Sequence, residues 1–182
     1  GELAKLKLNA DLDGSSISWA DEMRIGTINA DAQIDLTDNQ QSKLNVQSTG
    51  IKVAEQTVDS VDLSLTGKRD QHQLGLEIQS AIISLSGLLQ GSLNKDNQWA
   101  GRLQSMTIDN DMAGNWQLGE AGDIQLSADK QIMSKHCWLS AEQAQICIQG
   151  ENALPGAQAL VEINQLSMEI LKPWIEEYAK LS

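Results

Sequence analysis

The fold class is decided by the stretch Gln73-Leu74-Gly75-Leu76-Glu77-Ile78-Gln79. Leu74, Leu76 and Ile78 alternate with polar residues and one glycine. In an extended chain, successive side chains point to opposite sides, so these three apolar side chains share one side. The period of two predicts a β-strand with one apolar and one polar face.

The same alternation recurs along the chain, between turn signals such as Asp13-Gly14 and Thr66-Gly67. The spacing is uneven, which is typical of an antiparallel meander rather than of a counted repeat. Glycines such as Gly50 and Gly101 lie in or beside the expected strands and permit bulges and bends. We therefore predict an all-β domain over residues 1–171, built as an elongated, curved, antiparallel-rich sheet that forms an open trough.

The chain changes character near its end. Trp174, Ile175, Tyr178 and Leu181 recur at three-to-four spacing, which predicts an amphipathic helix. Pro173 suits the first turn of such a helix. We expect a short C-terminal helix over residues 172–182 that packs against or caps the domain, in preference to a helix that binds a partner.

Composition narrows the function classes. The 182 residues include 13 Lys and Arg against 25 Asp and Glu, a formal net charge of −12. This balance argues against binding nucleic acid and against docking on anionic membranes through basic patches. The five Trp and one Tyr are scattered, with no Phe, which disfavours a membrane barrel with aromatic girdles. No apolar run approaches ~18 residues and no signal peptide is visible, so we expect a piece of a longer protein.

Cys137 and Cys147 are the only cysteines. A hairpin centred near Glu142 would bring them face to face, and an oxidising compartment would then join them. Alternation places both on the polar face and Trp138 on the apolar face. A metal site is the rival interpretation, but His136 and Cys137 are strand neighbours that point oppositely, and a zinc site needs about four ligands.

One motif is reminiscent of a calcium loop. Asp109, Asp111, Gly114 and Glu120 fall at its first, third, sixth and twelfth positions. Ala113 at the fifth position has no ligand atom and the flanking segments are expected strands, so turn residues explain the pattern better. No phosphate loop or nucleophile elbow is present, and no carboxylate pair stands out. We expect no enzyme activity, no catalytic residue, no metal and no cofactor.

The apolar face is the candidate site. We place on it Leu63, Leu65, Leu74, Leu76, Ile78, Leu103, Ile108, Leu118, Leu126, Trp138, Ile146 and Ile148. Aliphatic side chains suit acyl chains, which need dry dispersion contact rather than specific polar groups. From the residues alone, however, an ordinary sandwich core is the favoured interpretation of this alternation.

Several pieces in order resemble the TamB family, the AsmA-like translocation and assembly module subunits of Gram-negative bacteria. They are Trp99-x-Gly101-x-Leu103, Gly114-x-Trp116-x-Leu118, Ile124-x-Leu126-Ser127, Cys137-Trp138, Ile146-Cys147-Ile148-x-Gly150 and the segment 166–173. The resemblance is sharp over residues 99–173 and moderate over 61–98. Their order looks like the middle-to-late region of that family.

The resemblance implies a periplasmic segment of a long protein anchored in the inner membrane, with a β-taco fold, an apolar concave face and a Cys137–Cys147 disulfide. It implies shielding of phospholipid acyl chains on their way to the outer membrane. The alternative it implies is a scaffold that binds β-strands of outer-membrane or autotransporter proteins, working with a TamA-like outer-membrane barrel partner. Either function would be non-enzymatic.

Overall fold

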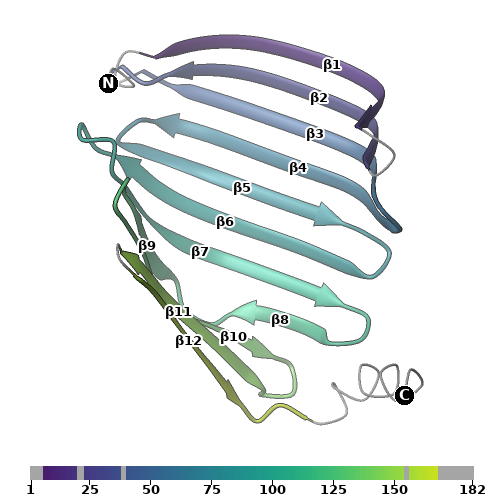
Figure 1. Cartoon of the computed structure of the whole chain (residues 1–182), viewed down its shortest axis with the longest axis vertical. Helices are drawn as coiled ribbons and strands as arrows, with labels where there is room; N and C mark the ends of the chain where they lie inside the picture. Colours follow the sequence, from purple (N-terminus) through teal and green to yellow (C-terminus); the bar gives the residue numbers. More distant parts are fainter. Residues whose placement is uncertain (1–5, 20–22, 38–39, 154–155, 168–182) are drawn as a thin grey trace.

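The computed structural model describes residues 6–19, 23–37, 40–153 and 156–167, and they form one twelve-stranded sheet (Figure 1). The strands are β1 (Lys7–Trp19), β2 (Met23–Asp35), β3 (Ser42–Val53), β4 (Gln56–Lys68), β5 (Gln71–Gln79), β6 (Ile83–Leu93), β7 (Trp99–Asn110), β8 (Gly114–Leu118), β9 (Gly122–Leu126), β10 (Lys130–Ser140), β11 (Gln145–Ala153) and β12 (Gly156–Asn164).

Every strand pair in the sheet is antiparallel, and the sheet order follows the chain order with one exception. The short strands β8 and β9 both pair with β7 on one side and with β10 on the other, so together they fill one strand position. The predicted all-β antiparallel meander is confirmed. The helix predicted over residues 172–182 lies outside the described residues.

Register sorts the side chains by polarity. Leu63 pairs with Leu76, and Leu65 pairs with Leu74, so apolar side chains meet in rows across the strands. Along β5, Leu74, Leu76 and Ile78 on this face are half-buried, whereas Glu77 and Gln79 on the opposite face are exposed and Gln73 is half-buried. The sheet that carries these rows is curved, as Figure 1 shows.

Two predicted turn signals are not turns. Asp13-Gly14 lies inside β1, where Gly14 pairs with Ile28 and the strand continues to Trp19. Thr66-Gly67 lies inside β4, where the two residues pair with Gln73 and His72. A local Asp-Gly signal is overridden here because the long register with β2 supplies the backbone of both residues with partners.

Two residues with a left-handed backbone conformation interrupt the alternation of side chains in β1 and β3. Such a residue can change which positions, odd or even, lie on the apolar face. Ser16 and Gly50 have φ of 55° and 63°. Beyond Ser16 the apolar residues occupy odd positions, beginning with Ile17. The Ile17 Cδ1 atom lies 2.9 Å from the place that a Gly14 Cβ would take, so Ile17 shares the face of Gly14. The apolar face therefore continues to the ends of these strands.

The cysteine hairpin forms as the sequence predicts. Cys137 and Cys147 are directly paired across β10 and β11 and are joined in a disulfide. Trp138 pairs with Ile146, so the disulfide lies on the opposite face from this apolar pair. The Ser140 hydroxyl accepts a hydrogen bond from the Ala144 N–H at 3.1 Å and closes the turn.

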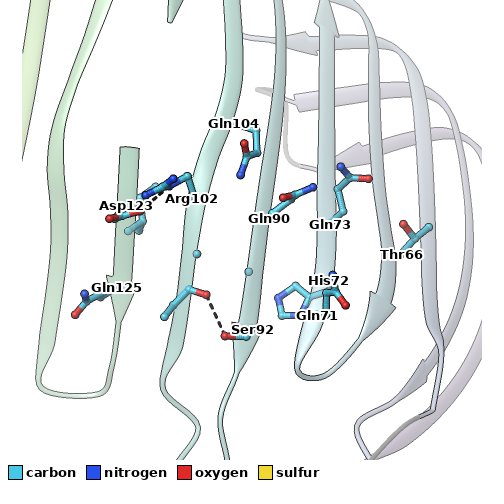
Figure 2. Close-up of a pocket in the computed structure, with 14 residues that line it drawn as sticks. Thr66, Gln71, His72, Gln73, Gln90, Ser92, Arg102, Gln104, Asp123 and Gln125 are labelled. Carbon is cyan, nitrogen blue, oxygen red and sulfur yellow. Dashed lines mark hydrogen bonds and ion pairs between the residues drawn. The ribbon is translucent and has the colours of Figure 1, made fainter. Parts of the chain in front are cut away.

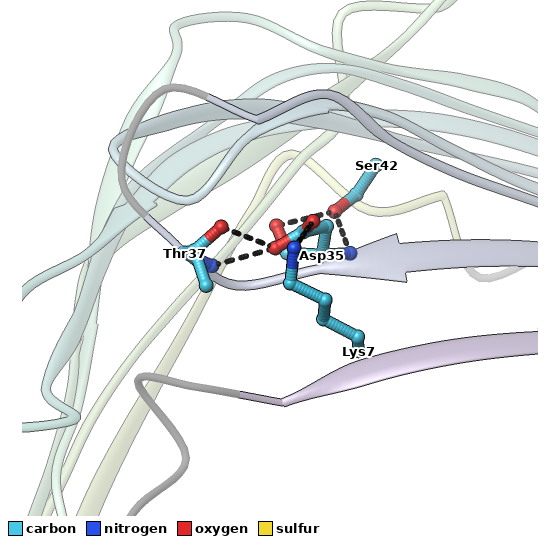
Figure 3. A network of polar contacts seen from close by, with 4 residues as sticks. All are labelled: Lys7, Asp35, Thr37 and Ser42. Atoms are coloured by element: carbon cyan, nitrogen blue, oxygen red, sulfur yellow. Dashed lines mark hydrogen bonds and ion pairs between the residues drawn. The ribbon is translucent and has the colours of Figure 1, made fainter.

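A polar network fastens the turn after β2 (Figure 3). The Asp35 carboxylate accepts hydrogen bonds from the Thr37 hydroxyl and N–H, and it pairs with Lys7 Nζ of β1 at 2.9 Å. Ser42 at the start of β3 bonds to the backbone N–H and carbonyl of Asp35. The Thr37 hydroxyl, followed by Lys7, lowers the pKa of Asp35 to about 2. The side chain and backbone of Asp35 together thus tie three strands to one another.

The Asp35 network predicts a pH-dependent stability. Because the folded-state pKa of Asp35 lies below the ~3.9 of an unfolded chain, its contribution is complete above pH ~4 and disappears as the pH falls towards 2. Asp35→Asn should therefore lower the free energy of unfolding at pH 6 more than at pH 2, as measured by urea denaturation. A difference that stays constant across this range would contradict the assignment.

The disulfide predicts a redox-dependent stability. Closing a loop of this length contributes roughly 2–3 kcal/mol in the chain-entropy model. Reduction of the native protein should lower its free energy of unfolding by about that amount. A Cys137→Ser/Cys147→Ser double variant should start at the lower value and not respond to reductant. Equal urea midpoints for the oxidised and reduced native protein would refute the prediction.

Candidate functional site

The register brings all twelve predicted positions to one face of the sheet, which we call the apolar face. They are Leu63, Leu65, Leu74, Leu76, Ile78, Leu103, Ile108, Leu118, Leu126, Trp138, Ile146 and Ile148. Leu103 and Ile108 are five positions apart, which in a regular strand would put them on opposite faces. A bulge between them restores the shared face, because Leu88 pairs with Ser105 whereas Leu89 pairs with Leu103. A second bulge in β10 separates Met133 from His136.

Other apolar residues on this face were not among those predicted. Val46 pairs with Leu63, Leu85 pairs with Ile108, and Leu89 pairs with Leu74. Trp116 lies opposite Ile108 and is one of the few buried apolar residues. The period of two that located Leu74 and Leu76 applies to these residues as well, so the signal was present in the sequence.

The apolar face has no second layer of protein in the described parts of the chain. Each strand packs chiefly against its neighbours in the sheet. The buried apolar residues of these parts are Trp116, Ala144 and Cys147, and most of the Leu and Ile side chains are half-buried. A sandwich core would bury them fully, so the described residues form an open trough and not a sandwich.

An aromatic contact lies at the edge of the apolar face that carries the β4–β5 and β6–β7 turns. The Trp99 ring lies where Cβ atoms at Gly91 and Gly101 would be, so both positions require glycine. Its indole Nε1 donates to His72 Nε2 at 2.7 Å. His72 Nδ1 faces the carbonyl oxygens of Lys68 and Arg69 at 3.1 and 3.2 Å. Because Nδ1 has only acceptors and Nε2 accepts, the neutral Nδ1–H tautomer fits this site.

Arg69 holds the turns at the same end. Its guanidinium is buried and donates to the carbonyl oxygens of Leu93 and Asn94 at 3.2 and 2.5 Å. The Leu93 N–H donates in return to the Arg69 carbonyl at 2.8 Å. The β4–β5 turn is thereby tied to the β6–β7 turn, and the strand ends there are held by polar contacts.

His136 is the second imidazole on the apolar face. It is fully buried, lies over Gly122 and stacks against Trp138 with ring centroids 6.2 Å apart. Its Nδ1 lies 2.6 Å from the Ser134 carbonyl oxygen. His136 Nε2 and Trp138 Nε1 are both buried, so neither ring nitrogen is exposed on the apolar face. The face stays apolar although it contains two histidines.

The polar face carries a shallow hollow of about 630 Å³ (Figure 2). Thr66, Gln73, Gln90, Arg102 and Asp123 are register neighbours across it. Arg102 Nε donates to Asp123 Oδ1 at 2.8 Å, and this bond lowers the pKa of Asp123. The pair is exposed and of the kind that adds little stability. The hollow presents amides and one neutralised ion pair rather than a reactive group.

The calcium-loop pattern forms a hairpin turn, as the alternative interpretation predicts. The Asn110 side-chain oxygen accepts hydrogen bonds from the N–H groups of Met112 and Ala113 at 2.9 and 2.7 Å. Within the described residues, no group of three or more His, Cys, Asp or Glu side chains could hold a metal ion. Those residues also contain no helix that is long and apolar enough to cross a membrane.

An open, curved, single-layer β-trough with an aliphatic interior defines a class of protein that offers apolar surface rather than reactive groups. The model of the TamB N-terminal domain matches residues 1–182, the whole chain, and the chain therefore belongs to the TamB family. This family acts in biogenesis of the cell envelope, is not known for enzymatic activity and associates with an outer-membrane partner of the TamA type. No solved structure matches the chain significantly.

The family match also corrects one detail of the sequence resemblance. The order of motifs looked like the middle-to-late region of the family, but the matching model is that of the N-terminal domain. Alternating strands of similar composition recur along such a chain, so short motifs identify the family better than they identify the position within it.

The Trp99 contact predicts a sharp difference between two glycines of one strand. Gly87→Ala adds a methyl whose nearest neighbour is 3.9 Å away, whereas Gly91→Ala places it in the Trp99 ring. Gly91→Ala should lower the free energy of unfolding by about 1–3 kcal/mol because a packed ring must move. Gly87→Ala is the matched control and should change stability by less than about 1 kcal/mol. Equal urea midpoints for the two variants would contradict the packing described.

Proposed function

We propose that the chain is a periplasmic segment that shields phospholipid acyl chains in its apolar trough, as part of lipid traffic towards the outer membrane. The single observation that carries this proposal is the apolar face itself. It combines aliphatic rows with half-exposed side chains and the absence of a covering layer in the described residues. An acyl chain that covers this surface stabilises the complex by about 25 cal/mol for each Å² of apolar surface removed from water.

The chemistry of the face supports a lipid rather than a polar ligand. Acyl chains need dispersion contact and dryness, which Leu and Ile side chains supply. The two histidines on the face have their polar atoms turned to the backbone, to Trp99 or into the sheet. A headgroup would remain at the open mouth of the trough, in water. The proposal therefore includes no recognition of a particular headgroup.

The disulfide supports the periplasm as the compartment. Cys137 and Cys147 are directly paired across a hairpin and joined, and structural disulfides persist in oxidising compartments. The family match supports an envelope location. An inner-membrane anchor for the parent protein remains part of the proposal and rests on the family resemblance.

A scaffold for client β-strands is the second candidate. The observation that favours it is that β1 and β12, within the described residues, each pair with a strand on one side only. The backbone of such a strand can accept an added strand by β-augmentation. Outer-membrane or autotransporter proteins, delivered to a TamA-like barrel, would be the clients. This function would use the strand edges and not the apolar face.

Leu76 and Gln79 allow a matched test on one strand. Leu76 is half-buried on the apolar face, while Gln79 is exposed on the polar face. Leu76→Asp should weaken binding of a fluorescent single-chain phospholipid, used below its micelle concentration, by at least about tenfold, because a charge would have to share the dry surface. Gln79→Asp adds the same charge and should leave binding unchanged.

The fold is the control for this experiment. Because Leu76 is only half-buried, Leu76→Asp should keep a cooperative melt by circular dichroism and lose about 1 kcal/mol of stability. Unchanged lipid binding by a folded Leu76→Asp variant would overturn the trough proposal. Retained capture of an unfolded outer-membrane protein by that variant would then favour the strand scaffold.

A further inference from the structure

The two rims of the trough differ in chemistry. Because the sheet is an antiparallel meander, its hairpin turns alternate between two opposite edges (Figure 1). The turns β1–β2, β3–β4, β5–β6 and β7–β8 lie together at the right in Figure 1, and we call the row of these four turns the open rim. The β10–β11 turn lies on the same edge beyond them, next to the start of β8, and has no large apolar residue. The turns β2–β3, β4–β5, β6–β7 and β9–β10 lie on the other edge, the closed rim.

The open rim carries exposed apolar side chains at each of its four hairpin tips. Trp19 is 78% exposed, Val53 50% and Ile82 52%. The complete set of exposed large apolar residues at these tips is Trp19, Met23, Val53, Ile82, Ile83 and Met112. Large apolar side chains are seldom left so exposed in a row on a soluble surface.

The closed rim has the opposite character. Its turns present polar and charged residues such as Asp70, Lys95 and Asp129. The Arg69 network and the Trp99–His72 contact lie at this edge. Exposed Leu6 and Leu126 stand near it, but at strand ends rather than at the tips of turns.

The apolar face runs out to the open rim. The phase shift at Ser16 and Gly50 keeps Ile17 on the face of Gly14, and Trp19 lies two positions further along the same strand. Residues two apart in a strand share a face, so the exposed tip of β1 continues the trough. At β1, the interior surface and the rim therefore form one connected apolar surface.

We propose that the open rim docks on the surface of a lipid bilayer that is zwitterionic rather than anionic. Neighbouring strands lie about 4.8 Å apart, so successive tips are spaced by about 10 Å along a line. A protein partner needs one contiguous apolar patch, whereas a fluid bilayer interface accepts separate wedges. Trp is favoured at that interface because its ring is apolar and its N–H is polar.

The charge of the chain selects the lipid. The formal net charge is −12, and the open rim itself includes Glu55, Asp109 and Asp111 beside Lys52. These carboxylates would be repelled by an anionic leaflet. Docking should therefore depend on insertion of apolar side chains. Electrostatic attraction between the protein and the lipid headgroups should contribute little to it. The inference concerns docking and does not require that the trough carry lipid.

The test is flotation of the purified chain with vesicles of phosphatidylcholine and phosphatidylethanolamine. A Val53→Ser/Ile82→Ser variant should bind these vesicles about tenfold more weakly, because two inserting side chains are lost. The control is Leu12→Ser/Leu160→Ser, which removes side chains that are 51% and 47% exposed and lie in the middle of β1 and β12, away from the hairpin tips. This control should bind as the native chain does.

Trp19 supplies a second readout. Vesicles with bromine-labelled acyl chains should quench part of the native tryptophan fluorescence, and Trp19→Phe should remove that part.

Equal flotation of the rim variant and the control variant would overturn the proposal, as would docking that requires phosphatidylglycerol. Self-association that is abolished by Val53→Ser/Ile82→Ser, with no vesicle binding by the native chain, would overturn it in favour of a second copy. Since the trough is tested with single-chain lipid and no vesicles, failure of one proposal is distinguishable from failure of the other.

Discussion

The structure depends on one constraint: a single sheet must satisfy its backbone without a second layer to bury its apolar side. In a sandwich, two apolar faces bury each other, and each large side chain gains about 1.5–3 kcal/mol from full burial. Here the described strands have only lateral neighbours, so Leu63 and Leu76 gain from each other and not from a layer above. The continuous antiparallel ladder and the cross-strand pairs must therefore provide most of the stability. The same constraint leaves the apolar face available to something outside the sheet.

To keep one face apolar over twelve strands, the alternation of side chains must be reset at some positions. A long twisted strand does not keep perfect alternation while the sheet curls, and the corrections lie at identifiable residues. Ser16 and Gly50 take left-handed conformations, and β7 and β10 absorb an extra residue opposite Leu88 and near Met133. The left-handed conformation costs local free energy at Ser16, because its Cβ crowds the backbone there, whereas Gly50 has no Cβ and avoids this cost. The placement of these corrections keeps Ile17, Leu103 and Ile148 on the side of their apolar neighbours.

The sequence was sufficient for the class of fold and for the face of each predicted site residue, because a period of two is a short-range signal. Leu74 to Ile78 and the Cys137–Cys147 hairpin are examples, since neighbours in the chain determine them. The positions of the turns were harder to predict from the sequence. Asp13-Gly14 has the local chemistry of a turn, yet β1 continues through it because β2 offers a long register. Arg69, His72 and Trp99 were also beyond reach, because their contacts join turns that are far apart in sequence.

An open apolar surface with two sheet edges is an aggregation hazard, and the chain limits that hazard through charge. β1 carries Lys7, Asp11 and Asp13, and β12 carries Glu162, which pairs with Lys135 of β10. Charged side chains on terminal strands discourage edge-to-edge pairing with another copy. The net charge of −12 adds repulsion between whole chains. The apolar residues of the trough are uncharged and do not themselves repel a ligand. A neutral apolar ligand meets none of this repulsion, so the charge pattern discriminates against a second copy and leaves the apolar face open to an acyl chain.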